Sequence, residues 1–205
     1  MKIKIQPNDV SAIPQDPYEL ISDIFIEAEK KIPVNPLSVV LATADKRGRP
    51  SSRTVLLKQY SRNGFVFFTN SQSRKGRQLD ENPYCSLTFH FAALCKQVHV
   101  EGKAARIAAA DSDSYFASRP RESQIGAWAS AQSREIPEGD SPEQRYQEFD
   151  ERFFHSDNVP RPGHWNGYRV VPERIEIWLE GAHRLHTRFC YTKENAQWRV
   201  ARLFP

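Results

Sequence analysis

The sequence lacks the marks of several protein classes. Its 205 residues include only three cysteines, Cys85, Cys95 and Cys190, and no CxxC pair. This odd number argues against a disulfide framework and indicates reduced thiols in a cytoplasmic protein. No segment approaches the roughly 18 apolar residues that a membrane-spanning helix needs. The start, MKIKIQP, has charge but no apolar core behind it, so we expect no secretory signal and no membrane partner.

The sequence also lacks a strong charge bias. It has 29 Lys and Arg against 25 Asp and Glu, a net charge of +4, and the basic residues are spread along the chain. A dedicated nucleic-acid binder normally concentrates its basic residues on one surface, so we expect no nucleic-acid partner. The GxGxxG, GxxxxGK[ST], GxSxG and HExxH motifs are absent, which argues against a Rossmann site, a P-loop, an α/β-hydrolase and a zinc protease.

The spacing of apolar residues predicts a mainly β protein. Residues 1–15 are expected to form a flexible arm, and residues 16–205 a single domain of ordinary composition. Asp16 and Pro17 open a helix that stops before Pro33, with an apolar face at Leu20, Ile21, Ile24, Phe25 and Ala28. Further helices are predicted at 74–81, 111–118 and 142–154, and residues 119–141 are expected to be irregular. Strands are predicted at 37–44, 52–60, 65–69, 85–91, 97–107, 167–171, 174–179, 184–191 and 198–203. Many short strands with few helices favour an antiparallel β-barrel or sandwich with flanking helices.

A first candidate site is Ser73-Arg74-Lys75 at a helix start. Backbone N–H groups and the positive end of the helix dipole attract anions there, and Arg and Lys add positive charge. The alternative interpretation is a solvated basic helix start.

A second candidate is Arg184-Leu-His-Thr-Arg188. If this segment is a strand, Arg184, His186 and Arg188 share one face, which indicates a site for an electron-rich ligand. The alternative is a polar face turned to solvent. On such a strand His183 and His186 would face opposite sides, so we predict no metal site. Trp178 precedes this segment closely enough to lie near the same site.

A third candidate runs from Tyr115 to Ser123. Tyr115 and Arg119 lie one helical turn apart, and Pro120 turns the chain so that Ser123 can return to them. A phenol, a guanidinium and a hydroxyl make a suitable phosphate cradle. The alternative is an ordinary helix end.

These motifs also resemble a known family. Arg53-Thr-Val-Leu-Leu-Lys58, Phe68-Thr69-Asn, Ser73-Arg-Lys-Gly, Lys96-Gln97-Val, Tyr115-Phe-Ala-Ser-Arg119-Pro-Arg-Glu-Ser123, Gln132-Ser133, Trp178 and Arg184-Leu-His-x-Arg188 occur in the order typical of the pyridoxine (pyridoxamine) 5′-phosphate oxidase family. The resemblance extends from about residue 16 to the closing Arg202-Leu-Phe-Pro205. It implies an FMN-binding split β-barrel and a homodimer that holds FMN at the subunit interface.

The resemblance assigns roles residue by residue. It implies FMN contacts from Arg53, Thr54, Val55, Leu56, Leu57, Lys58, Phe68, Thr69, Arg74, Lys75, Gln97, Gln132, Ser133, Trp178 and Arg188. Substrate phosphate would bind to Lys58, Tyr115, Arg119 and Ser123. Arg184 and His186 would lie over the substrate ring as the catalytic residues, although hydride transfer to a flavin does not require His186 to be an essential base.

The implied reaction converts pyridoxamine or pyridoxine 5′-phosphate to pyridoxal 5′-phosphate, with O2 as acceptor and H2O2 as product. The sequence departs from the family where residues 1–15 lack an Arg-x-x-Tyr lid segment, where Phe68 replaces Tyr and where Thr187 replaces Asp. The main alternative is a phenazine-type FMN oxidase with an unphosphorylated substrate. The retained phosphate cradle favours the vitamin B6 reaction, whereas the missing lid segment favours the alternative. A non-enzymatic flavin-binding protein and a nucleic-acid-binding β-barrel are further alternatives.

Overall fold

A computed structural model of the chain describes residues 13–205. Most of the expected N-terminal arm therefore lies outside the described residues. Ile13 is buried, and the Tyr191 hydroxyl donates a hydrogen bond of 3.0 Å to the Pro14 carbonyl. Within the described part of the chain, no helix combines the length and the apolar character needed to cross a membrane.

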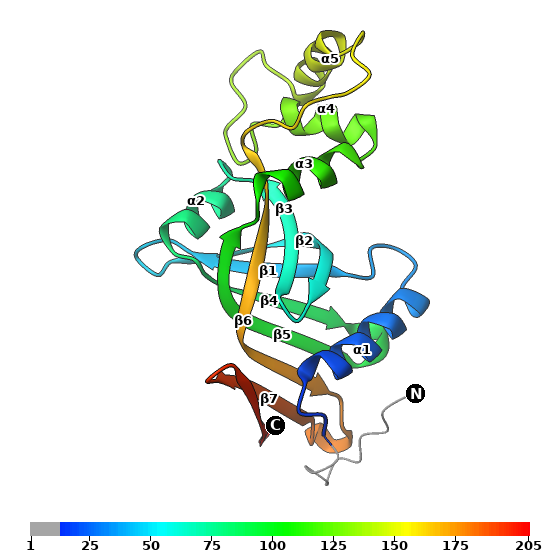
Figure 1. The fold of residues 1–205 in the computed structure, drawn as a ribbon, viewed down its shortest axis with the longest axis vertical. Helices are drawn as coiled ribbons and strands as arrows, with labels where there is room; N and C mark the ends of the chain where they lie inside the picture. The colour runs from blue at the N-terminus through cyan, green and yellow to red at the C-terminus, as the bar shows by residue number, and fades with distance from the viewer. Residues whose placement is uncertain (1–12) are drawn as a thin grey trace.

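Six antiparallel strands form a closed barrel (Figure 1). The strand order is β3-β2-β1-β4-β5-β6, and pairing of β3 with β6 closes the ring. A hairpin of β7 and β8 extends the sheet beyond β6. This architecture confirms the predicted mainly β fold with flanking helices. The strands are β1 (Ser38–Ala44), β2 (Pro50–Ser61), β3 (Gly64–Asn70), β4 (Tyr84–Phe91), β5 (Lys96–Arg106), β6 (Trp165–Leu179), β7 (Thr187–Glu194) and β8 (Gln197–Leu203).

Helix α1 (Pro17–Lys31) packs its apolar face on the barrel core. Asp16 caps its first turn by accepting from the Tyr18 N–H at 3.0 Å. The Phe25 ring lies 4.9 Å from that of Tyr60 and 4.8 Å from that of Phe89. The predicted face is confirmed because Leu20, Ile21, Ile24, Phe25 and Ala28 are all buried.

Strand β6 is one continuous element of 15 residues. The prediction of two strands, 167–171 and 174–179, was wrong because a proline between them does not end the strand. Pro172 lies opposite Gly102, where the register of β5 against β6 shifts. A Cβ atom on Gly102 would lie 2.1 Å from the Val171 carbonyl oxygen, so the backbones approach closely there. Before this step β6 pairs with β3 and closes the barrel, and after it β6 pairs with β7.

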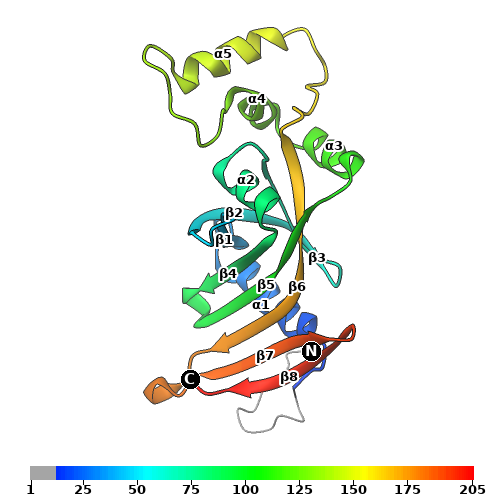
Figure 2. The same cartoon turned by 90° about the vertical axis from the view of Figure 1, so that its left-hand side faces the viewer.

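Helices α3 (Ala109–Ala117), α4 (Arg121–Ala129) and α5 (Pro142–Arg152) gather at one end of the molecule, and β7 and β8 lie at the other (Figures 1 and 2). The helical end has its own apolar cluster, which consists of Phe116, Ile125, Phe153, Val159 and Trp165. Helix α4 corrects the prediction that residues 119–141 are irregular throughout. Its signal was the helical spacing of Ile125, Trp128 and Ala129, which the many neighbouring polar residues obscured.

Candidate active site

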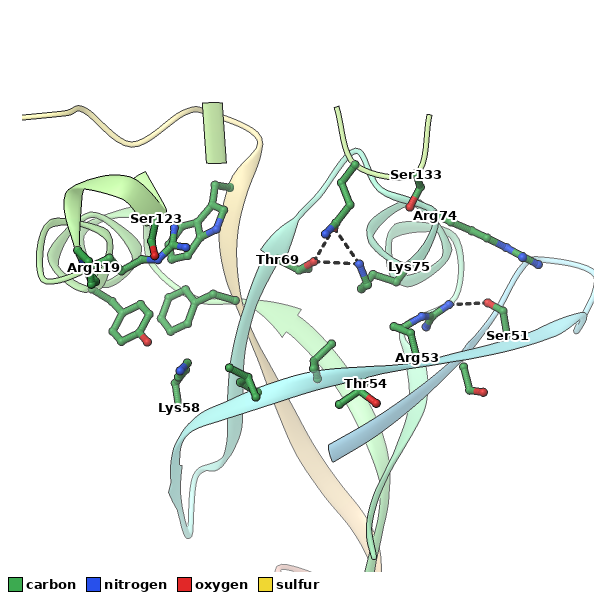
Figure 3. A pocket seen from close by; sticks show the side chains of 18 of the residues that line it. Ser51, Arg53, Thr54, Lys58, Thr69, Arg74, Lys75, Arg119, Ser123 and Ser133 are labelled. Atoms are coloured by element: carbon green, nitrogen blue, oxygen red, sulfur yellow. Dashed lines mark hydrogen bonds between the residues drawn. The ribbon is translucent and has the colours of Figure 1, made fainter. Parts of the chain in front are cut away.

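A cavity of about 920 Å³ lies between the barrel and the helices of this end (Figure 3). Strands β2 and β3 form its floor, and α2 (Arg74–Glu81), the α3–α4 turn and the segment after α4 surround it. Its volume suits a large ligand or two smaller ones. The lining residues are Ser51, Ser52, Arg53, Thr54, Val55, Leu56, Lys58, Phe68, Thr69, Arg74, Lys75, Tyr115, Ser118, Arg119, Pro120, Ser123, Gln132, Ser133 and Trp165.

The charge of this lining has one sign. Five cationic side chains border the cavity, and no Asp or Glu is among the described residues that line it. Cations held together without acidic partners repel one another, so the arrangement favours a negatively charged ligand. The five cations are Arg53, Lys58, Arg74, Lys75 and Arg119.

Arg53, Arg74 and Lys75 form one cationic group on the same side of the cavity (Figure 3). The last two open helix α2, which Ser73 caps by accepting from the Gly76 N–H at 3.3 Å. A Cβ atom on Gly76 would lie 2.2 Å from the Ser71 carbonyl oxygen, so glycine lets the helix start approach this turn. The predicted basic helix start thus faces a cavity and is not simply a solvated surface.

Lys75 is a buried ammonium with only neutral hydrogen-bond partners. Its Nζ donates to Gln132 Oε1 at 2.9 Å and to Thr69 Oγ1 at 3.3 Å. Burial, and then the charge of Arg53, lower the pKa of Lys75 to about 8. Burial and the charge of Arg74 also lower the pKa of Arg53. An anion bound among these groups would relieve both effects.

A second cationic group lies on the opposite side of the cavity, where Figure 3 shows Arg119 and Ser123 together and Lys58 below them. The Arg119 guanidinium stacks on the Trp165 ring at 4.8 Å, and its Nη1 is buried without a hydrogen-bond partner among the described residues. The Tyr115 ring stacks on Phe68 at 4.1 Å. An unsatisfied guanidinium nitrogen beside two hydroxyl groups suits a phosphate.

The remaining predicted residues form a separate group around the β6–β7 hairpin. Gln97, Trp178 and Arg188 are direct cross-strand neighbours, and the Trp178 ring lies 4.5 Å from the His186 ring. Trp178 therefore does lie beside the Arg/His segment. Leu57 is buried in the barrel core instead of lining the cavity.

The prediction that Arg184, His186 and Arg188 share a strand face was wrong. Strand β7 starts only at Thr187, because residues 180–186 form the loop between paired Leu179 and Thr187. Arg184 has a positive φ of 63°, and the His186 N–H donates to the Arg184 carbonyl at 2.9 Å. This tight turn removes the alternation on which the prediction rested.

The cavity and the hairpin group lie at opposite ends of strand β6. Trp165 lines the cavity and Trp178 belongs to the hairpin group, thirteen residues further along β6. At about 3.3 Å per residue the strand path between them is roughly 40 Å. A single chain therefore does not bring all of the predicted site residues together.

Comparison with known proteins identifies the family of this chain. A family described as pyridoxamine 5′-phosphate oxidase matches residues 25–153, and the family's C-terminal dimerisation region, described for pyridoxine 5′-phosphate oxidase, matches residues 165–205. The chain belongs to the pyridoxamine 5′-phosphate oxidase family. The resemblance predicted from sequence is thereby confirmed, and Trp178, His186 and Arg188 of the hairpin group fall within the dimerisation region, whereas Gln97 lies outside it.

Individual relatives agree with this family. Pyridoxine/pyridoxamine 5′-phosphate oxidases from Myxococcus xanthus and Paraburkholderia xenovorans are 45% and 47% identical, and the alignments cover 94% and 96% of this chain and 93% and 92% of theirs. Among solved structures, PhzG from Burkholderia lata in complex with tetrahydrophenazine-1-carboxylic acid has a TM-score of 0.89 at 27% identity, covering 99% of both chains. A family-related FMN-binding protein from Nostoc punctiforme shares the fold, with a TM-score of 0.73 at 13% identity.

Sequence reasoning missed several residues at the cavity. Ser51, Ser52, Ser118, Pro120 and Trp165 all line it. The ring of Trp165 supports the Arg119 guanidinium. The three serines and the proline adjoin predicted site residues in sequence, which was the available signal.

Proposed function

We propose that the protein is an FMN-dependent oxidase that converts pyridoxamine or pyridoxine 5′-phosphate to pyridoxal 5′-phosphate, with O2 as acceptor and H2O2 as product. The main support is the cavity with two cationic groups on opposite sides and no acidic lining residue in the described chain. Two such groups suit two phosphates, one on a cofactor and one on a substrate. The names of the relatives support the same reaction.

The residues present fit an FMN phosphate in the first group. Arg53, Arg74 and Lys75 would surround it, and the α2 N-terminus adds its dipole. Thr69, Gln132 and Ser133 border the cavity as neutral polar partners. Bound FMN would supply the redox chemistry: the substrate carbon bearing the amine or hydroxyl would lose a hydride to the flavin and its nitrogen or oxygen a proton, O2 would take up the electrons to give H2O2, and with the amine substrate water would then release ammonia from the imine.

The second group would hold the substrate phosphate. Lys58, Tyr115, Arg119 and Ser123 supply two cations and two hydroxyl groups. This phosphate lies away from the reacting carbon, so its binding energy serves to align the substrate ring.

The hairpin group would complete the site from a second copy of the chain. We assign Gln97, Trp178 and Arg188 to FMN contacts across the subunit interface of a homodimer, and Arg184 and His186 to the face of the substrate ring. The match of residues 165–205 to a dimerisation region supports this assembly. This assembly also accounts for the distance between the hairpin group and the cavity within one chain.

A second candidate is oxidation of an unphosphorylated ring substrate, because PhzG has a closely similar fold and was solved with such a ligand. The second cationic group weighs against it, because a carboxylate such as this ligand's offers one charge and two oxygens, whereas a phosphate can accept from both cations and both hydroxyls of the group.

We expect the purified protein to carry an oxidised-flavin spectrum. Anaerobic addition of pyridoxine 5′-phosphate should bleach it, because the flavin accepts the hydride and O2 is absent. Admitting O2 should restore the yellow form and release H2O2. Flavin that stays oxidised with both phosphorylated vitamers would contradict the proposed reaction, and a protein that cannot be reconstituted with FMN would contradict the cofactor.

Lys75 should make FMN binding pH-dependent. With a pKa of about 8 in the free protein, its amine is cationic below that pH and neutral above it. We expect the Kd of the apoprotein for FMN to rise above pH 8, by at most about tenfold per pH unit, because one proton must return on binding. Quenching of flavin fluorescence between pH 7 and pH 9.5 measures this change.

Lys75→Met tests whether Lys75 causes this pH dependence. It should weaken FMN binding at pH 7 and remove the dependence of the Kd for FMN on pH. The lowered pKa of Lys75 means that the cationic amine is less favourable in the folded apoprotein than in the unfolded chain, which binds more protons between pH 8 and pH 10.5. The free energy of unfolding should therefore rise from pH 8 towards the ordinary pKa of 10.5. The variant should accordingly be more stable than the wild-type apoprotein at pH 7. An unchanged pH dependence in the variant would assign it to another group.

A further inference from the structure

Gln78 is a buried glutamine beneath the cationic group, and the sequence motifs did not single it out. It lies on α2, three residues after Lys75, and its side chain faces the barrel and not the cavity. The hydroxyls of Thr43 and Ser51 both donate to Gln78 Oε1, at 2.6 and 2.8 Å. A single amide oxygen therefore accepts from two strands of the barrel, β1 and β2.

The same two hydroxyls hold Arg53. Arg53 Nη1 donates to Thr43 Oγ1 at 2.7 Å and to the Leu41 carbonyl at 3.2 Å, and Nη2 donates to Ser51 Oγ at 2.6 Å. Figure 3 shows Ser51 bonded to Arg53 on the floor of the cavity. Arg53 is thus fixed at both terminal nitrogens.

The donors and acceptors in this network have only one consistent arrangement. A guanidinium only donates, so both hydroxyls must accept from Arg53. Each hydroxyl has one proton left to donate, and Gln78 Oε1 receives both. Without an acceptor at residue 78, the proton of the buried Thr43 hydroxyl would lose its partner, and so would that of the half-buried Ser51 hydroxyl. The two hydroxyls would then no longer be held as acceptors for Arg53.

The neutrality of this acceptor is also important. A carboxylate could accept the same two hydrogen bonds, but it would place a negative charge one hydroxyl away from Arg53. That charge would compensate the guanidinium and oppose an anion in the cavity. Glutamine supplies the oxygen without the charge, in keeping with a lining in which no described residue is acidic.

We propose that Gln78 is a positioning residue that, through Thr43 and Ser51, orients Arg53 and keeps its charge available for the phosphate of FMN. This inference rests on the proposed function. It concerns affinity for the phosphate and not the redox chemistry, so it can be measured without turnover.

The test compares the Kd values of the apoprotein for FMN and for riboflavin, which lacks the phosphate, by quenching of flavin fluorescence. Gln78→Glu keeps the acceptor and adds a charge, and it should weaken FMN binding on the order of 100-fold with riboflavin binding changed less than about threefold. Gln72→Glu is the matched control, because Gln72 is exposed, precedes α2 and lies outside the cavity lining. It should leave both Kd values nearly unchanged.

Thr43→Val tests the connection separately. It removes one hydroxyl with little change in volume, and Thr43 itself does not line the cavity. It should weaken FMN binding by about three- to tenfold alone. It should add little to Gln78→Leu, because both break the same connection. This variant keeps the proposal testable if Gln78→Leu does not fold.

Three results would overturn the inference. If Gln78→Glu binds FMN as tightly as the wild type, the charge at residue 78 does not act on the phosphate. If it loses FMN and riboflavin equally, Gln78 supports the structure in general. Additive effects of Thr43→Val and Gln78→Leu would show two independent contacts. A wild-type protein that does not prefer FMN to riboflavin would overturn the proposed function itself, which separates the two failures.

Discussion

Arg119→Ala should raise the KM for pyridoxine 5′-phosphate on the order of 10- to 100-fold, the effect of losing hydrogen bonds from a charged group worth about 1.5–3 kcal/mol. Arg119, whose buried Nη1 has no hydrogen-bond partner within residues 13–205, lies away from the first cationic group, so the Kd for FMN should stay within about twofold of wild type. Steady-state oxidase assays and flavin-fluorescence titrations measure the two quantities. An equal loss of both would show that Arg119 serves the cofactor.

Arg152→Ala is the control for this variant. Arg152 also stacks on aromatic rings at the helical end, 5.6 Å from that of Trp128, but it does not line the cavity. It should therefore leave the KM nearly unchanged. A comparable rise in KM in Arg152→Ala would mean that disturbance of the helical end, and not loss of a phosphate contact, causes the effect.

Two inactive variants should restore activity when they are combined in one dimer. Arg53→Glu reverses a charge in the cavity, and Arg184→Glu reverses one in the exposed loop before β7. A heterodimer of the two has one site in which both contributing chains are intact and one site with both defects. Differently tagged chains, co-expressed and purified through both tags, should show about half of the wild-type activity per dimer.

The control for this experiment combines two cavity variants, Arg53→Glu and Lys75→Glu, each of which reverses a charge in the group proposed to hold the FMN phosphate. Each site of that heterodimer then has one defect, so no activity should return. Recovery in the control, or its absence in the cavity–loop pair, would contradict a site built from two chains.

The sequence predicted most of the fold because its local signals agree with the packing. The spacing of apolar residues identified nearly every strand, and Asp16-Pro17 identified the start of α1. The failures are at places where tertiary contacts override local preference. Pro172 is accommodated within β6 by the register shift at Gly102, and α4 is stabilised by packing of Ile125.

The site was predicted in part for similar reasons. The basic start of α2 and the Tyr115–Ser123 turn are local features, and the cavity includes residues of both. The prediction for the Arg184–Arg188 segment failed because the alternation of side chains along a strand does not apply to the tight loop before β7. Gln78 was missed because its role depends on hydroxyls contributed by β1 and β2, which no spacing within α2 reveals.

The close contact between Gly102 and β6 has a consequence for quaternary geometry. With no room for a side chain there, the backbone contact sets the angle at which the C-terminal hairpin leaves the barrel. A larger residue at 102 would displace the hairpin from the barrel, and in the proposed homodimer the two subunits would then meet out of alignment. Such a lesion would resemble a catalytic defect in assays, although every catalytic side chain would be unaltered.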